Sequence, residues 1–288
     1  MISTIQNKIL LYGRMIKFSH TIFALPFALS SLVMAYQHHS PSLLDFVWIL
    51  LAMVSARSAA MGFNRIADAY FDLKNERTAI REIPSGLLSK KEALLFVTAS
   101  ALIFIFSAAM LSRLCFYLSF PVLFFLLFYS YTKRFTALCH LFLGFAISLA
   151  PIGTYLALTD TLSWSIVFLA LSLLTYIAGF DILYACQDIE FDRTQGLFSL
   201  PAKMGPKKAM MISSGLHLST VVLLFAMYLS FGMHSVFLIF LLVIAILLII
   251  EHRLVSPHDL SHINIAFFHI NSIISLTLFM GVLIQGFF

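Results

Sequence analysis

Hydrophobic positions along the chain come in long runs that short polar segments separate. Each run approaches the roughly 20 apolar residues with which a helix crosses a bilayer. The third and fourth runs lie so close together that we expect a tight hairpin between them. The pattern therefore predicts an all-α membrane protein, a bundle of nine transmembrane helices. The expected spans are residues 18–37, 44–64, 93–111, 114–131, 136–158, 163–185, 209–230, 234–250 and 264–285.

The composition agrees with this pattern. Of the 288 residues, 61% are hydrophobic and only 11% are charged, and the mean hydropathy is +0.98. A soluble domain cannot hide that much apolar surface, because a large part of any soluble surface has to be polar. We expect residues 1–288 to form a single integral-membrane domain.

Lysine and arginine lie almost entirely on one side of the predicted topology. Of the 18, Arg113 lies on the opposite side and Arg57 within the second span, whereas the others precede the first span or follow an even-numbered one. Positive charge favours the cytoplasmic side, so we expect a cytoplasmic N-terminus and an outside C-terminus in a bacterial inner (plasma) membrane. The net charge of +5 then reflects topology and attraction to anionic lipid or substrate, and we expect no nucleic-acid partner.

The second span ends in the segment NRIADAYFD, residues 64–72. Asn64, Asp68 and Asp72 recur every four residues, so on a helix they would form one ridge. In the predicted topology this ridge lies at the C-terminal end of an inward-running helix, where the helix dipole disfavours carboxylates. Ionisable groups at membrane depth are costly, which makes these residues candidates for function.

The sixth span ends in a matching segment, DILYACQDIEFDRTQGLFSLP, residues 181–201. Asp188 and Asp192 are again four residues apart, and we expect them to form a ridge with Asp181, which lies deeper in the membrane. The topology puts both acidic motifs, 64–86 and 181–201, on the cytoplasmic side. Arg, Thr, Gly and Pro follow the acidic residues in each motif, which suggests a weak internal repeat.

The two motifs together have the chemistry of a divalent-cation site. Carboxylates at this spacing repel one another unless a cation balances them. Oxygen ligands without a nearby His or Cys favour a hard cation, and Mg²⁺ is usually held by one or two carboxylates plus substrate phosphates. The neighbouring basic residues could hold the rest of a diphosphate. We therefore predict an acid-lined diphosphate site in a central cavity that opens to the cytoplasmic side.

At these residues the chain resembles the UbiA superfamily of intramembrane prenyltransferases, most closely its 4-hydroxybenzoate polyprenyltransferase-like branch. NRIADAYFD is similar to the first family motif, N-D-x-x-D-x-x-x-D, and QDIEFD is similar to the second, D-x-x-x-D. The segments GFDILYA, GLFSLP and YTKRFT also resemble the family, and Arg57 matches an arginine of the second span. The resemblance covers essentially the whole chain and implies a nine-helix bundle.

The resemblance implies an enzyme that transfers a polyprenyl group from a polyprenyl diphosphate to an aromatic hydroxy acid, in ubiquinone or menaquinone biosynthesis. It implies that Asp68, Asp72, Asp188 and Asp192 hold Mg²⁺ with help from Asn64, and that the metal stabilises the departing diphosphate. The implied substrate-binding residues are Arg57, Arg77, Arg81, Lys133, Arg193, Asp181 and Tyr184.

Two departures from the family pattern leave the acceptor open. Arg65 follows Asn64 where many members have Asp, and REIPSG at 81–86 replaces the usual R-P. Both look like the subgroup that serves menaquinone synthesis by the futalosine route, so 1,4-dihydroxy-6-naphthoate is the alternative acceptor to 4-hydroxybenzoate. Arg57 would pair either with the acceptor carboxylate or with Asp181. From another class, an ion-coupled membrane transporter would also carry ionisable residues within its spans.

Overall fold

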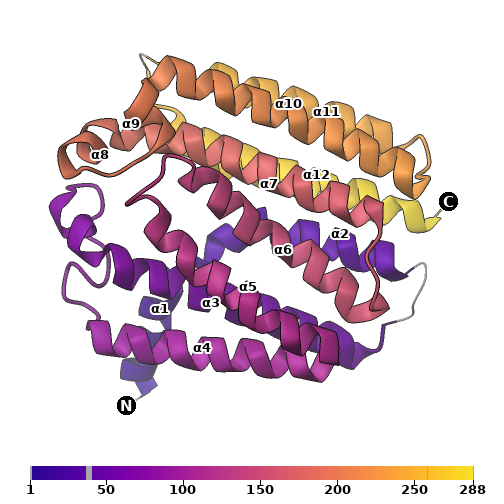
Figure 1. The fold of residues 1–288 in the computed structure, drawn as a ribbon, viewed down its shortest axis with the longest axis horizontal. Helices are drawn as coiled ribbons and strands as arrows, with labels where there is room; N and C mark the ends of the chain where they lie inside the picture. Colours follow the sequence, from indigo (N-terminus) through magenta and orange to yellow (C-terminus); the bar gives the residue numbers. More distant parts are fainter. Residues whose placement is uncertain (1, 37–40, 258, 288) are drawn as a thin grey trace. The chain divides into compact units, whose positions relative to one another are not determined.

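The structure is a computed structural model that describes residues 2–36, 41–257 and 259–287. These residues form helices and their connections, drawn in sequence colours in Figure 1. The chain divides into two compact units. Unit 1 comprises Met1–Thr21 and Leu43–Tyr131, and unit 2 comprises Ile22–Ser42 and Thr132–Phe288.

Unit 1 is built around two helices that run side by side, α3 and α4 (Figure 1). A capping box starts α4, because the side chains of Ser89 and Glu92 each bond the other's backbone N–H. Ser112 alone connects α4 to α5, which confirms the expected tight hairpin. The helices of unit 1 are α1 (Ile2–Met15), α3 (Leu43–Lys74), α4 (Lys90–Leu111) and α5 (Arg113–Thr132).

Unit 2 is centred on α7, which packs along both α6 and α10 (Figure 1). Glycines let these helices approach closely, as small residues do in membrane bundles. A Cβ on Gly144 of α6 would lie 2.4 Å from the carbonyl oxygen of Leu174 in α7, and one on Gly179 would meet the ring of His217. The α-helices of unit 2 are α2 (Leu25–Tyr36), α6 (Cys139–Thr159), α7 (Trp164–Ala185), α8 (Ile189–Gln195), α9 (Leu200–Met204), α10 (Pro206–Phe231), α11 (Phe237–Leu254) and α12 (Asn271–Leu283).

Short helical turns complete the chain. They are the 3₁₀ turns η1 (Phe18–Phe23), η2 (Cys186–Asp188) and η4 (Ile284–Phe287) and the π-helical turn η3 (Ile265–Ile270). The turn η1 leads directly into α2, and η3 leads into α12, so each of these pairs forms one span. The turn η2 separates α7 from α8 and so interrupts the second acidic motif.

All nine predicted spans are confirmed, because the described residues contain nine helical segments long and apolar enough to cross a membrane. The predicted end of the first span, residue 37, lies outside the described residues. The second and sixth spans run further than predicted, to Lys74 and Gln195. Both extensions carry an acidic motif, whose polar residues end the apolar run without ending the helical segment.

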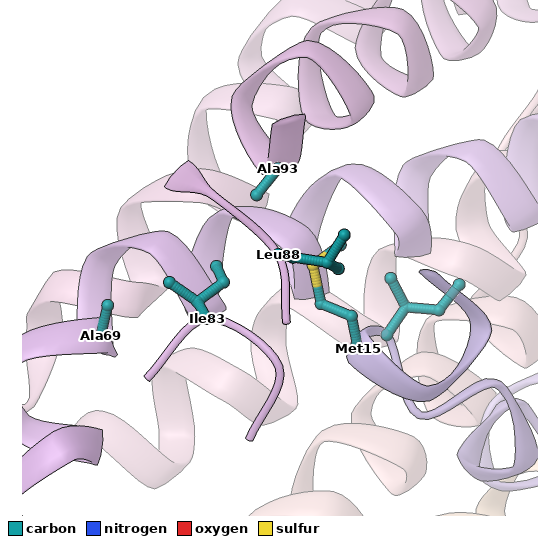
Figure 2. Close-up of a cluster of buried hydrophobic side chains, with 6 residues drawn as sticks. Met15, Ala69, Ile83, Leu88 and Ala93 are labelled. Atoms are coloured by element: carbon teal, nitrogen blue, oxygen red, sulfur yellow. The ribbon is translucent and has the colours of Figure 1, made fainter. Parts of the chain in front are cut away.

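A buried apolar cluster in unit 1 holds the first acidic motif in place (Figure 2). It joins Met15 of α1, Ala69 of α3 and Ala93 of α4 to Ile83 and Leu88 of the loop between α3 and α4. The loop is thereby packed against the helix that it leaves. The polar side chains of the loop are therefore presented to those at the end of α3.

Candidate active site

The first acidic motif lies on one uninterrupted helix, α3, so the predicted ridge of Asn64, Asp68 and Asp72 is formed. The amide of Asn64 donates a hydrogen bond of 2.8 Å to Asp68 Oδ2. The helix continues because alanines with high helix propensity alternate with the polar residues. It ends at Lys74, where the side chain of Asn75 accepts a 3.0 Å hydrogen bond from the Arg77 N–H, a local bond typical of turns.

Asp72 is the buried member of this ridge, with 6% of its surface exposed. Its Oδ1 accepts a 2.6 Å hydrogen bond from Arg81 Nη1, and its carbonyl accepts one of 3.1 Å from Thr78 Oγ1. Its second carboxylate oxygen, Oδ2, is buried and has no hydrogen-bond partner among the described residues. A buried unpartnered carboxylate oxygen is costly unless it meets a cation or a donor. Asp72 is therefore suited to hold a metal ion.

Unit 1 also gathers basic side chains around this ridge. Arg57 Nη2 donates to the carbonyl of Lys17 (3.3 Å), and Arg65 Nε donates to the carbonyl of Met15 (3.1 Å). Burial lowers the pKa of Lys17, and the positive charges of Arg65, Arg81 and Arg77 lower it further. We call Lys17, Arg57, Arg65, Arg77 and Arg81 the basic cluster. The cations of this cluster repel one another. A polyvalent anion that binds beside them offsets this repulsion and is itself stabilised.

Lys17 is a candidate that the sequence analysis did not identify. It lies in the short connection between α1 and η1, with a positive φ of 46° that is uncommon outside glycine. The sequence signal was weak, since Lys17 is one of several basic residues ahead of the first span. The contact of Lys17 with Arg57 depends on how α1 packs against α3.

The second acidic motif, in unit 2, does not lie on one uninterrupted α-helix, which the predicted ridge of Asp181, Asp188 and Asp192 assumed. The helix α7 ends at Ala185, the 3₁₀ turn η2 carries Asp188, and Asp192 lies on the separate helix α8. The helix α8 then ends at Gly196, whose φ of +66° is a conformation that favours glycine.

Asp192 is fully buried and is held by two side chains. Its Oδ1 lies 2.8 Å from Lys133 Nζ, and its Oδ2 accepts a 2.7 Å hydrogen bond from Ser199 Oγ. Burial by itself lowers the pKa of Lys133, but the charge of Asp192 and the hydrogen bond to it outweigh burial and raise that pKa. The N–H of Phe198, in the segment after α8, donates to the carbonyl of Lys133 (2.7 Å). This hydrogen bond ties that segment to the connection between α5 and α6.

The remaining predicted residues of unit 2 have different surroundings. Asp181 Oδ2 lies 2.7 Å from His140 Nδ1, so the partner of Asp181 is a histidine of α6. The ring of Tyr184 lies 4.2 Å from that of Phe267, centroid to centroid. Arg193 is exposed and donates from Nε to the carbonyl of Ala202 (3.0 Å).

Within each unit, the described residues hold no group of three or more His, Cys, Asp or Glu side chains in a metal-binding arrangement. Each unit does bring an acidic motif together with a cation: Asp72 with Arg81, and Asp192 with Lys133. The donor atoms are all oxygens, which suits Mg²⁺ better than a softer metal. Both motifs therefore have the chemistry to bind a metal together with a phosphate group.

Comparison with known proteins gives the same family from sequence and from fold. The model of the UbiA prenyltransferase family matches residues 24–273. A 4-hydroxybenzoate octaprenyltransferase of Alcanivorax borkumensis is 33% identical over 174 residues, 60% of this chain and 60% of that protein. The chain thus aligns with somewhat less than two thirds of the length of such curated relatives.

Solved structures cover nearly the whole chain. The apo structure of a UbiA homologue from Aeropyrum pernix K1 matches with a TM-score of 0.83 and 30% identity, over 93% of this chain and 98% of that one. A UbiA homologue from Archaeoglobus fulgidus, bound to GPP and Mg²⁺, matches with a TM-score of 0.66 over 95% of this chain and 99% of that one. At 20% identity the latter likeness shows the fold alone. By its family match and its fold, the chain belongs to the UbiA prenyltransferase family.

Proposed function

We propose that this protein transfers a polyprenyl group from a polyprenyl diphosphate to an aromatic hydroxy acid of the 4-hydroxybenzoate type, in the synthesis of a respiratory quinone. The observation that carries the proposal is the pairing of each acidic motif with a cation, Asp72 with Arg81 and Asp192 with Lys133. Relatives named 4-hydroxybenzoate octaprenyltransferase support the choice of acceptor class.

The metal in this proposal is Mg²⁺, held by Asp68, Asp72, Asp188 and Asp192 with Asn64 assisting. The buried, unpartnered Oδ2 of Asp72 supports it. When bound, Mg²⁺ supplies Lewis-acid stabilisation of the charge that develops on the diphosphate as the prenyl group departs. The bound structure of the Archaeoglobus fulgidus homologue with GPP and Mg²⁺ supports this assignment by analogy.

In this proposal, residues of the chain bind the diphosphate and the substrate and exclude water. Arg81 contacts Asp72, and Lys133 contacts Asp192. In the proposal both cations also bind diphosphate oxygens beside these carboxylates. The exposed side chains of Arg77 and Arg193 bind the outer oxygens of the same group, and Arg57 and Tyr184 bind substrate deeper in the bundle. The apolar spans line the path of the isoprenoid tail and exclude water from the allylic cation, which water would otherwise convert to an alcohol.

We place the protein in a bacterial inner membrane with its N-terminus in the cytoplasm and its C-terminus outside. The strong bias of Lys and Arg along the predicted topology supports this orientation. We also propose that the whole chain acts as one prenyltransferase domain. The family match over residues 24–273, which includes parts of both units, supports this.

The test uses purified protein in detergent with a polyprenyl diphosphate and Mg²⁺. 4-Hydroxybenzoate and 1,4-dihydroxy-6-naphthoate are offered separately, and the prenylated product is measured by mass spectrometry. We expect Mg²⁺-dependent product from one acceptor and its loss in Asp188→Asn. The control is Asp160→Asn, because Asp160 is an αL helix-end residue, a conformation that Asn tolerates. Product from the naphthoate alone would reassign the acceptor, and undiminished product in Asp188→Asn would refute the proposed role of the second motif.

A further inference from the structure

A histidine and a carboxylate meet inside unit 2. His140 is the second residue of α6 and Asp181 lies in the last turns of α7, and Nδ1 of the histidine is 2.7 Å from Oδ2 of the aspartate. A carboxylate can only accept a hydrogen bond, so Nδ1 carries the proton whether the ring is neutral or charged. The pair is therefore a directed hydrogen bond from His140 to Asp181.

The two members differ in how open they are. The side chain of His140 is 3% exposed, whereas that of Asp181 is 27% exposed. His140 holds Oδ2, and the described residues show no hydrogen bond to the other oxygen, Oδ1. A partly open carboxylate within a membrane-spanning helix is costly to keep and is a candidate for contact with a polar ligand. Asp181 is thus the member of the pair that is open to a ligand, whereas His140 is enclosed by the protein.

A second buried histidine in the same unit has contacts at both ring nitrogens. His217 uses both ring nitrogens: Nδ1 lies 2.9 Å from His252 Nε2, and Nε2 lies 3.3 Å from the carbonyl of Tyr176. Nδ1 of His140 contacts Asp181, whereas its Nε2 is buried and has no hydrogen-bond partner among the described residues. The bond to Asp181 is therefore the polar contact that His140 is placed to make.

The packing of α6 on α7 sets the distance between the pair. Gly144 lies one turn after His140, on the same face of α6, and Leu174 lies two turns before Asp181 on α7. The absence of a side chain at Gly144 lets α6 reach the Leu174 backbone, with 2.4 Å between a built Cβ and the carbonyl oxygen. This close approach brings the His140 ring within hydrogen-bonding distance of Asp181.

We propose that His140 is a positioning residue that holds Asp181 so that Oδ1 accepts a hydrogen bond from the hydroxyl group of the aromatic acceptor. The inference rests on the proposed function. Asp181 lies in α7, seven residues before Asp188 of the turn η2 and further from the cytoplasmic side in the predicted topology, so the acceptor ring would lie deeper in the membrane than the diphosphate. A hydroxyl that donates to a carboxylate pushes electron density into its ring and makes the ring a better nucleophile.

The step balances without another reactant. As the C1–O bond of the prenyl diphosphate breaks, its electron pair leaves with the diphosphate, and a ring carbon ortho to the hydroxyl forms the new C–C bond. The proton on that carbon then passes to the released diphosphate, which restores the aromatic ring. The hydroxyl proton is shared with Asp181 during the attack and stays on the oxygen at the end.

The test compares His140→Asn, His140→Gln and Asp181→Asn. An asparagine amide lies near the position of Nδ1, whereas a glutamine amide lies near that of Nε2, so only His140→Asn keeps the donor to Asp181. We expect kcat/KM for the acceptor to fall about 10–100-fold in His140→Gln and Asp181→Asn, the loss typical when a group that orients a ligand is removed. We expect His140→Asn to stay within about 3-fold of wild type.

Binding of a prenyl thiodiphosphate, a donor analogue that does not ionise, is measured with Mg²⁺ in every variant and is expected to be unchanged. His217→Gln is the matched control, because it replaces another buried histidine and should lower stability without a selective effect on the acceptor. An active His140→Gln with an inactive His140→Asn would overturn the proposal in favour of contact through Nε2. Unchanged kinetics in all three variants would also overturn it. Failure of wild-type protein to prenylate any acceptor would instead refute the proposed function.

Discussion

Gly144 offers a direct way to test the packing that builds the candidate acceptor site. In Gly144→Ala the new Cβ would lie 2.4 Å from the carbonyl oxygen of Leu174, whereas ordinary contacts begin at 3.4 Å. The two helices must therefore separate by roughly 1.0 Å, the difference between these distances. Gly153 lies on the same helix, and apart from its chain neighbours and its own helix backbone the described residues place no heavy atom within 4 Å of a built Cβ, so Gly153→Ala is a matched control.

The expected energies have opposite signs in the two variants. Replacing an exposed helical glycine by alanine stabilises by about 0.5–1 kcal/mol, and overpacking a close contact costs about 1–3 kcal/mol. We therefore expect Gly153→Ala to be slightly more stable than wild type and Gly144→Ala to be less stable than Gly153→Ala by about 1–3 kcal/mol. Reversible unfolding in mixed micelles measures the difference.

The same displacement should weaken the bond between His140 and Asp181. A misplacement of about 1 Å at a substrate-positioning group can cost on the order of 100-fold in rate. We expect Gly144→Ala to lose acceptor kcat/KM while it still binds the donor analogue, and Gly153→Ala to keep both. Equal stability and equal acceptor kinetics in the two variants would refute the inferred close packing of α6 on α7.

Three further predictions concern the charged and polar groups. Lys133→Ala should lower the free energy of unfolding in micelles by about 1–3 kcal/mol, because it leaves the buried Asp192 with Ser199 as its partner. The loss is smaller than for a fully buried ion pair, because the side chain of Lys133 is 35% exposed. Asn271→Leu should cost about 1–3 kcal/mol, because it removes the 2.9 Å donor to the buried Glu251, and a double variant with Glu251→Leu should recover part of that loss. Donor affinity should fall as alkaline pH removes the charge of Lys17, at lower pH than for an ordinary lysine because its pKa is lowered, and Lys17→Met should bind donor weakly at all pH values. An unchanged free energy of unfolding in Lys133→Ala or in Asn271→Leu would contradict the first two expectations. A donor KM that does not vary with pH would contradict the third.

The nine spans could be predicted because the length and polarity of an apolar run are local properties. The same holds for the ridge of Asn64, Asp68 and Asp72, which needs only a continuous helix with good helix formers between the polar residues. The helix α1 was not predicted. Its residues do not form an apolar run long enough to resemble a span.

The conformation of the second motif could not be predicted from local sequence. No Gly or Pro marks the end of α7 at Ala185, and the segment that follows is held by contacts with distant residues, such as Phe198 N–H with the Lys133 carbonyl. The pair of His140 and Asp181 joins residues 41 apart in the sequence. Such pairs depend on how helices pack, which neither spacing nor composition specifies.

The most direct test of the account is the stoichiometry of the reaction. Purified protein is incubated with a polyprenyl diphosphate, Mg²⁺ and the preferred acceptor, and released diphosphate and prenylated acceptor are measured in the same sample. We expect equal amounts of both products, and neither of them after EDTA treatment. Movement of substrate across reconstituted vesicles with no release of diphosphate would contradict the account and identify a carrier instead.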